Sequence, residues 1–184
     1  MTLQLPERVH ASTSRSESWE LHVLAATDWQ ELQDTRLHAL GESPHAFVAT
    51  YAEEAVLSES YWRGRIELST WTVARQCDQT IGLARLRTPE DEPLEVRYIE
   101  SVWVHPLHRC KGVVRSMMED LELRALDAGV ARLRLWVLDT NESAEDAYVK
   151  LGYNVELPEC IQQTRKLTGN GMPVHERRMV KDIL

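Results

Sequence analysis

The chain lacks the apolar segments that would place it in a membrane or direct its export. No apolar run approaches the roughly 18 residues that a membrane-spanning helix needs. Residues 1–18 contain no apolar core of signal-peptide length, so we expect a polar and mobile leader there. At 184 residues and 43% hydrophobic content, the chain suits one globular domain. We therefore expect a single domain over residues 19–184, located in the cytoplasm and without a membrane partner.

Cysteine is scarce, and basic residues are outnumbered. The three cysteines, Cys77, Cys110 and Cys160, are odd in number and form no C-x-x-C pair, so reduced thiols fit best. The 21 lysines and arginines face 29 aspartates and glutamates, which gives a formal charge of -8. Because nucleic-acid binding needs a broad basic face, this balance argues against a nucleic-acid partner.

Two common nucleotide-binding fingerprints are also missing. The sequence has neither a G-x-x-x-x-G-K-[ST] pattern nor a G-x-G-x-x-G segment after a predicted strand. It contains no internal repeat and no low-complexity tract. A basic loop at residues 105–115 is therefore not a Walker loop.

What is present is a succession of strand and helix patterns that predicts a mixed α/β sheet. Seven segments are predicted as strands, the sixth only at its start: 19–24, 69–76, 81–87, 94–105, 131–139, 154–159 and 175–183. Four segments are predicted as helices: 27–40, 58–68, 113–128 and 140–153. Thr27 and Gln30 form a capping-box pattern for the first helix, which is expected to close before Gly41. We expect an irregular connection over 41–56.

The basic loop stands where the longest predicted helix begins. Arg109, Lys111 and Arg115 surround Gly112. The helix that follows has apolar residues at three- and four-residue spacing: Val114, Met117, Met118, Leu121, Ala125 and Ala128. The missing side chain of Gly112 lets an anion approach the backbone, and the positive end of the helix adds attraction. A pyrophosphate would fit this loop; a solvated turn is the alternative that these residues leave open.

Two motifs in combination resemble the GNAT superfamily of acetyl-CoA-dependent N-acyltransferases, over about residues 19–183. The first is V-x-P-x-x-R/Q-x-x-G-x-G/A, matched at Val104, Pro106, Arg109 and Gly112. The second is N-x-x-A-x-x-x-Y-x-K-L-G-[FY], matched at Asn141, Ala144, Tyr148, Lys150, Leu151, Gly152 and Tyr153. The resemblance implies a central twisted, mostly antiparallel sheet of about six to seven strands with helices on both faces. Asn141 or Ser143 is expected to cap the last helix.

The first motif departs from the family pattern at two positions. Val114 stands where the family has its second glycine or alanine, and Cys110 replaces the glycine that usually follows the arginine at Arg109. Because Val114 is β-branched and lies where the pyrophosphate would approach, we expect weakened cofactor binding or displaced phosphates.

The resemblance implies acetyl-CoA as cosubstrate and assigns residues to it. The pantetheine arm would pair with the strand from Val102 to Val104. The pyrophosphate would take backbone N–H groups of the loop residues Arg109, Cys110, Lys111, Gly112, Val114 and Arg115. Asn141, Ala144 and Tyr148 would face the cofactor from the last helix.

Two residues are candidates for proton transfer. An ammonium group must lose a proton before its nitrogen can attack the thioester. Strand alternation places Glu100 on a face with Tyr98, Val102 and Val104, and a carboxylate among apolar neighbours suits a general base. The alternative is that Glu100 pairs with Arg85 or Arg87. The resemblance implies that Tyr148 returns a proton to the leaving thiolate; a core tyrosine is the alternative. A strand N–H near Val104 would meet the oxyanion.

Several other residues are weaker candidates. His105, His108 and Cys110 lie close together, but Pro106 interrupts a helical register and no fourth ligand follows, so no metal is expected. Cys110 has no base partner that would make it a reactive thiol. The two tryptophans Trp103 and Trp136 are expected in the core or along the pantetheine groove. Arg177 and Arg178 are expected to be surface charges.

The sequence determines least about the acceptor of the acetyl group. The resemblance implies that residues 41–65 and 158–175 hold it. Four residues there are candidates, three acids that would attract a cationic amine and a tryptophan that would flank it: Glu53, Glu54, Glu59 and Trp62. A solvated helix face is the alternative interpretation of the same residues. A small-molecule primary amine is the first choice, and a protein N-terminus or lysine the second. A non-catalytic acyl-CoA-binding sensor domain and a domain without CoA stay open, and the resemblance allows a homodimer.

Overall fold

The computed structural model describes residues 18–156, 162–166 and 173–184. The expected leader up to residue 17, Cys160 and most of the segment 158–175 lie outside these ranges. Within them, no helix is both long enough and apolar enough to cross a bilayer.

Eight described strands form one sheet in the order β1-β2-β3-β4-β5-β8-β6, with β7 paired to β8 as well. The strands are β1 (Glu20–Val23), β2 (Ser69–Gln76), β3 (Gln79–Arg87), β4 (Val96–Val104), β5 (Arg132–Leu138), β6 (Asn154–Val155), β7 (Gln162–Lys166) and β8 (Pro173–Asp182). The pair β4 and β5 is parallel, and the other described pairs are antiparallel. The predicted mixed, mostly antiparallel sheet is confirmed, and β7 is a strand that the sequence did not indicate.

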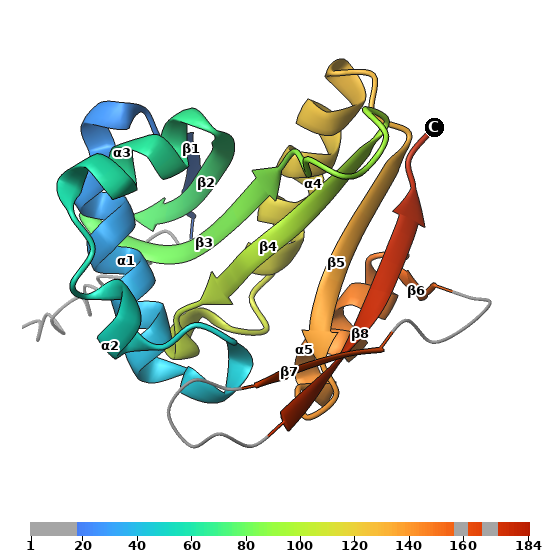
Figure 1. Cartoon of the computed structure of the whole chain (residues 1–184). Coiled ribbons are helices and arrows are strands. Elements are labelled where there is room, and N and C mark those ends of the chain that lie inside the picture. Colours follow the sequence, from blue (N-terminus) through green and yellow to red (C-terminus); the bar gives the residue numbers. More distant parts are fainter. Residues whose placement is uncertain (1–17, 157–161, 167–172) are drawn as a thin grey trace, which may run out of the picture.

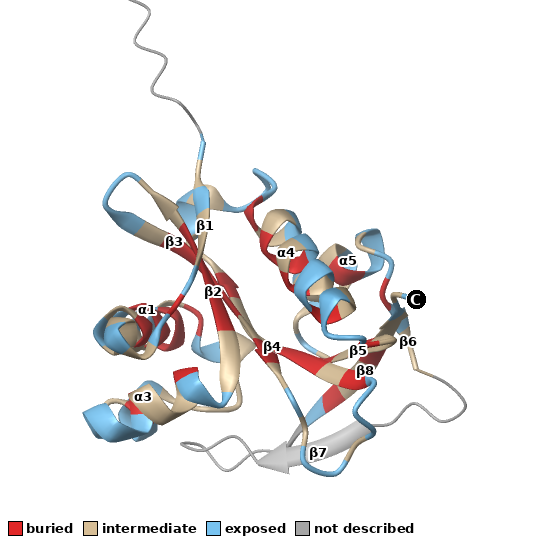
Figure 2. Cartoon of the chain, turned by 90° about the horizontal axis from the view of Figure 1, so that it is seen from above, coloured by how far each residue is buried: buried red, intermediate tan, exposed pale blue. Residues whose placement is uncertain are grey.

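Helices cover both faces of the sheet, as predicted (Figures 1 and 2). They are α1 (Trp29–Glu42), α2 (Tyr51–Glu54), α3 (Glu59–Glu67), α4 (Val113–Asp127) and α5 (Glu142–Lys150). Under α1 and α3 lies an α1-side core: Leu24, Leu32, Ala39, Trp62, Ile66, Trp71, Val73, Leu83 and Trp103. Under α4 and α5 lies an α4-side core, whose members include Ile81, Ile99, Val113, Met117, Met118, Leu121, Leu133, Tyr148 and Tyr153.

The boundaries of α1 differ from the prediction. The backbone N–H of Ala25 donates to Asp28 Oδ2 at 2.8 Å in a short 3-10 turn, Ala26–Asp28, and α1 begins after it without a side-chain cap, so the predicted capping box of Thr27 and Gln30 does not form. The helix continues through Gly41 to Glu42 and ends where Ser43 precedes a proline, because a residue before proline is disfavoured in the helical region. A single glycine near the end of a helix costs only about 1 kcal/mol, which tertiary packing offsets.

The connection predicted to be irregular contains the short helix α2. Thr50 begins it: its hydroxyl accepts from the N–H of Glu53 at 3.3 Å, and Glu53 Oε2 accepts from the N–H of Thr50 at 3.0 Å. This reciprocal pair is a capping box, so the sequence carried the signal in T-x-x-E.

The helix α4 follows the predicted periodicity and packs closely on the sheet. Its buried residues recur at three- and four-residue spacing: Val113, Met117, Met118, Leu121 and Ala125. Gly82 on β3 makes room for it, since a Cβ there would lie 3.0 Å from the side chain of Met117. The absence of a side chain at Gly82 therefore allows α4 to lie close to β3.

Candidate active site

The strands β4 and β5 separate and open the site. They pair only between Val96–Tyr98 and Arg132–Arg134, and beyond that point they diverge (Figure 1). No described strand pairs with the β5-facing edge of the second half of β4. An extended ligand can therefore add to this edge through backbone hydrogen bonds, as predicted for the pantetheine arm at Val102–Val104.

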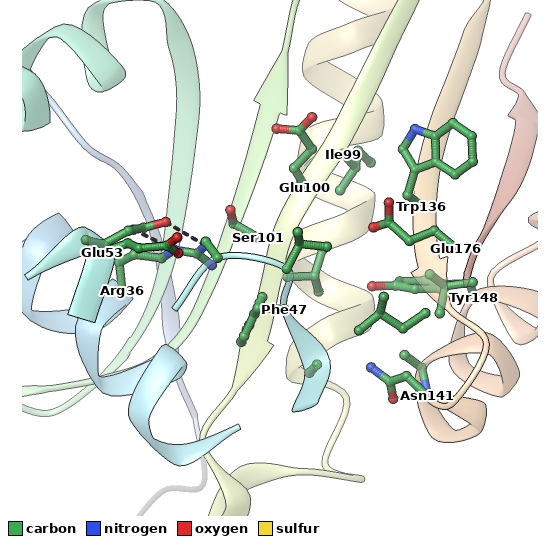
Figure 3. Close-up of a pocket in the computed structure, with 18 of the residues that line it drawn as sticks. Arg36, Phe47, Glu53, Ile99, Glu100, Ser101, Trp136, Asn141, Tyr148 and Glu176 are labelled. Carbon is green, nitrogen blue, oxygen red and sulfur yellow. Dashed lines mark hydrogen bonds and ion pairs between the residues drawn. The ribbon is translucent and has the colours of Figure 1, made fainter. Parts of the chain in front are cut away.

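A cavity of about 440 Å³ lies where the strands diverge (Figure 3). It is bounded by β4, β5, the start of α5, the start of β8 and the segment around α2. Its lining residues include Arg36, Phe47, Glu53, Glu54, Arg65, Ile99, Glu100, Ser101, Val102, Trp136, Leu138, Asn141, Ala144, Tyr148 and Glu176. The structure thus brings together the predicted residues Glu100, Val102, Asn141, Ala144 and Tyr148.

Tyr148 lies at one wall of this cavity. The residue is 8% exposed, and its hydroxyl points into the cavity (Figure 3). Burial raises the pKa of Tyr148, so the phenol is protonated at neutral pH and can donate a hydrogen bond. Its ring contacts that of Tyr153, which donates to Glu122 Oε1 at 3.1 Å and thereby ties the end of α5 to α4.

Asn141 caps α5 at the same wall. Its Oδ1 accepts from the backbone N–H of Ala144 at 3.3 Å, so of the two predicted caps it is Asn141, and not Ser143, that performs this role. The cap fixes the first turn of α5 beside the cavity, where Ala144 leaves space for a ligand.

A bulge in β4 changes the predicted face of Glu100. Ser101 has a φ of 56°, and the pairing of β4 with β3 slips by one residue there. As a result Glu100 lies on the same side as Trp103 of the α1-side core, whereas Val102 and Val104 pack against the α4-side core. The prediction that Glu100 shares a face with these valines is wrong, because one extra residue reverses the alternation.

The surroundings of Glu100 are polar. Its carboxylate accepts from Arg85 at 3.3 Å and from Arg87 at 2.9 Å, which confirms the alternative of an arginine partner. Burial lowers the pKa of Arg85 to about 10, although the charge of Glu100 acts in the opposite direction. The carboxylate of Glu100 is therefore already engaged by two guanidinium groups.

The basic loop has the backbone form of an anion site. Cys110 and Gly112 have positive φ values of 60° and 94°, directly before α4 begins. The first N–H groups of α4 have no acceptor within the helix, and the helix dipole adds positive potential. Val114 packs with part of its side chain against the α4-side core. Arg115 pairs with Glu119 at 3.5 Å.

The side chain of Arg109 is directed toward α1 and holds the loop in place. It donates to Glu42 at 2.7 Å and to the carbonyl oxygen of Val104 at 3.0 Å. Partial burial acts to raise the pKa of Glu42, but hydrogen bonds from Ser43 and Trp103 and the charge and hydrogen bond of Arg109 outweigh it, so this pKa lies below its ordinary value. An anion at this loop would therefore be bound mainly by backbone N–H groups and less by the Arg109 guanidinium group.

The predicted acceptor residues are mostly engaged elsewhere. Glu54 is buried and accepts from Arg36 at 2.9 Å and Arg65 at 3.1 Å. Trp62 has no exposed surface and belongs to the α1-side core, so it cannot flank an acceptor. Glu59 is absent from the cavity lining and pairs with Arg63. Only Glu53 and Glu54 of the predicted set line the cavity.

The remaining candidates are two tryptophans, two arginines and the possible metal ligands. Trp103 is buried in the α1-side core and Trp136 lines the cavity, as expected. Arg177 and Arg178 are not simple surface charges: their side chains are 30% and 14% exposed, Arg177 pairs with Glu145, and Arg178 lies over the ring of Trp136. No group of three or more His, Cys, Asp or Glu in the described ranges has the arrangement of a metal site.

One cavity residue, Glu176, was missed from the sequence. It is 6% exposed, lies near the start of β8, and its carboxylate points into the cavity between Trp136 and Tyr148 (Figure 3). A charged residue at the start of a strand gives no local signal of burial. Glu176 is buried because β8 is flanked here by both β5 and β7, a pairing between distant segments.

A family model supplies the deciding comparison. The model of the acetyltransferase (GNAT) family matches residues 29–153, more than half of the chain. The chain belongs to the acetyltransferase (GNAT) family. The two sequence motifs that resemble this family lie in the loop before α4 and in the capped helix α5.

Curated relatives match the GNAT chain over a short segment. Thialysine N-epsilon-acetyltransferase of Bos taurus is 40% identical over 55 residues, which are 30% of this chain and 32% of that protein. The Sus scrofa protein of the same name is 38% identical over 55 residues, with the same coverage. The aligned segment thus spans about a third of these relatives' length.

Solved structures share the GNAT fold over nearly the whole chain. The acetyltransferase of GNAT family from Streptococcus pneumoniae has a TM-score of 0.74 at 15% identity, covering 91% of this chain and 100% of that one. The yncA structure from Salmonella typhimurium, determined with its cofactor acetyl-CoA, has a TM-score of 0.70 at 16% identity, covering 91% and 95%. At such identities the likeness shows the common fold.

Proposed function

We propose that this GNAT protein transfers the acetyl group of acetyl-CoA to a primary amine of a small molecule, by direct attack in a ternary complex. The observation that carries the proposal is the cavity between the diverging strands, into which the Tyr148 hydroxyl points. The edge of β4 with which no described strand pairs leads to it, and the loop before α4 has the backbone form that anions bind.

Different residues bind different parts of acetyl-CoA. Backbone N–H groups from Arg109 to Arg115 hold the pyrophosphate, and the edge of β4 at Val102–Val104 orients the pantetheine arm. Asn141 positions the first turn of α5. Tyr148 stands at the thioester sulfur and donates a proton to it as the C–S bond breaks, which spares the release of a bare thiolate. A strand N–H near Val104 meets the oxyanion.

A small amine suits the size of the site. About 440 Å³ falls within the range of small-molecule cavities. The curated relatives are named for such an amine, thialysine. The opposite wall carries the buried ion cluster of Arg36, Glu54 and Arg65, which gives that end of the cavity a polar surface for the rest of the acceptor.

The test measures free thiol released from acetyl-CoA in the presence of thialysine, lysine, spermidine or a peptide with a free N-terminus. Release that depends on a small amine is the expected result. Release with the peptide alone would make the protein a peptide N-acetyltransferase instead. Binding of acetyl-CoA without release in the presence of any of these amines would contradict enzymatic function and leave an acyl-CoA-binding domain.

A further inference from the structure

The cavity contains four carboxylates, which differ in their position relative to Tyr148. Glu54 is held by Arg36 and Arg65, and Glu100 by Arg85 and Arg87. Glu53 caps α2 through the backbone and hydroxyl of Thr50. Glu176 lies between Trp136 and Tyr148, across the cavity from Glu53 (Figure 3).

The position of Glu176 fits a role with a cation at the reaction centre. Its carboxylate and the Tyr148 hydroxyl both point into the cavity where β4 and β5 diverge (Figure 3). The residue is 6% exposed, and a charge removed from bulk water interacts strongly with an opposite charge placed nearby. Trp136, whose ring Arg178 covers from one side, forms the adjacent wall. A primary ammonium group entering between these residues would meet a carboxylate and the acyl-transfer site together.

We propose that Glu176 binds the ammonium group of the acceptor and is its general base, in place of Glu100. This proposal rests on the acetyl transfer proposed above and identifies the acceptor as an amine that is protonated in solution. Glu176 accepts one proton from the ammonium group, directly or through one water. The freed nitrogen lone pair forms the C–N bond to the thioester carbon. The C–S bond then breaks, Tyr148 protonates the sulfur, and the tyrosinate regains a proton from the amide nitrogen; Glu176 returns its proton to solvent.

The experiment compares three variants that replace a carboxylate by an amide: Glu176→Gln, Glu100→Gln and, as a control on the exposed strand β1, Glu20→Gln. Thiol release is measured from pH 6 to 10, about the range in which alkylamines and histidine-like groups titrate, with thialysine, lysine and spermidine. Removal of a general base lowers kcat/KM by about 10²-fold or more at neutral pH. We expect this loss for E176Q, a loss of less than about tenfold for E100Q, and none for E20Q. The deficit of E176Q should shrink as pH rises, because the amine then loses its proton without help.

A second amine separates proton removal from a structural effect. Methoxyamine is uncharged at neutral pH, so its reaction needs no base, and E176Q should use it about as well as the unmodified protein does. Equal losses with methoxyamine and the alkylamines at all pH values, or activity of E176Q within about threefold of the unmodified protein, would overturn the assignment. If E176Q does not fold, the activity of Glu176→Asp is measured with methoxyamine and with the alkylamines. We then expect a greater loss of activity with the alkylamines. Absence of thiol release by the unmodified protein, with acetyl-CoA bound, would refute the proposed function itself.

Discussion

The substitution Cys110→Gly is expected to stabilise the protein, because Cys110 has a left-handed backbone. A φ of 60° costs a residue with a Cβ about 1–2 kcal/mol, and glycine does not incur that cost. Glycine loses about 0.5–1 kcal/mol more backbone entropy on folding. The thiol is exposed, so no buried contact disappears. The net gain is about 0.5–1 kcal/mol, which for a domain of this size raises the thermal unfolding midpoint by about 1–4 °C.

Urea titration at constant pH measures this gain as a higher midpoint with an unchanged slope. Cys110→Ala is the matched control, since it removes the thiol, keeps the Cβ, and should leave the midpoint unchanged. Cys77→Gly in the turn between β2 and β3, where φ is 53°, should give a similar gain without affecting the loop before α4. Equal midpoints for the glycine and alanine variants at position 110 would refute the reasoning from backbone strain.

Three further predictions concern other parts of the site. Tyr148→Phe should lower turnover at least about tenfold, measured as thiol release, while acetyl-CoA affinity is nearly unchanged; unchanged turnover would remove the hydroxyl from the mechanism. The pKa of Glu42 is lower in the folded than in the unfolded state, so its stabilising contribution is present above its ordinary value of 4.5 and lost as pH falls through the lower folded value. Glu42→Gln should therefore lower the urea midpoint at pH 7 and reduce the fall in stability on acidification; an acid dependence equal to that of the unmodified protein would contradict this. Gly82→Ala places a Cβ 3.0 Å from Met117 and 3.1 Å from Val113, so it should lower the free energy of unfolding by about 1–3 kcal/mol in the same titration. An unchanged free energy of unfolding would show that α4 shifts to accept the Cβ without cost.

Local patterns in the sequence predicted the fold and the cofactor side of the site. The three- and four-residue spacing from Val114 to Ala128 predicted α4, because that helix buries one face on the sheet; the structure buries Val113 in place of Val114. The second motif assigned Asn141 and Tyr148 to one short helical segment, and both residues line one cavity in the structure. These features depend on neighbours within about two turns, which a single sequence contains.

The acceptor side depends on long-range structure, and there the sequence was insufficient. The bulge at Ser101 puts a serine at a positive φ, which no local composition indicates, and this reversed the face assigned to Glu100. Glu176 is buried by strands that join β8 from two other parts of the chain. Trp62 was placed at the acceptor on its aromatic character, but the packing of α3 directs it into the core. Such outcomes follow from tertiary pairing and packing, which strand and helix propensities do not contain.

The most direct test of acetyl-CoA binding is the thermal unfolding midpoint with and without acetyl-CoA, with free adenosine diphosphate and coenzyme A as controls. A ligand at about 100 times its Kd that binds only the folded state adds about 2.7 kcal/mol. For a domain of this size the midpoint should therefore rise by about 5–10 °C with acetyl-CoA. No rise at millimolar acetyl-CoA would mean that Val114 and the loop before α4 close the site, and acetyl transfer by this protein would be contradicted.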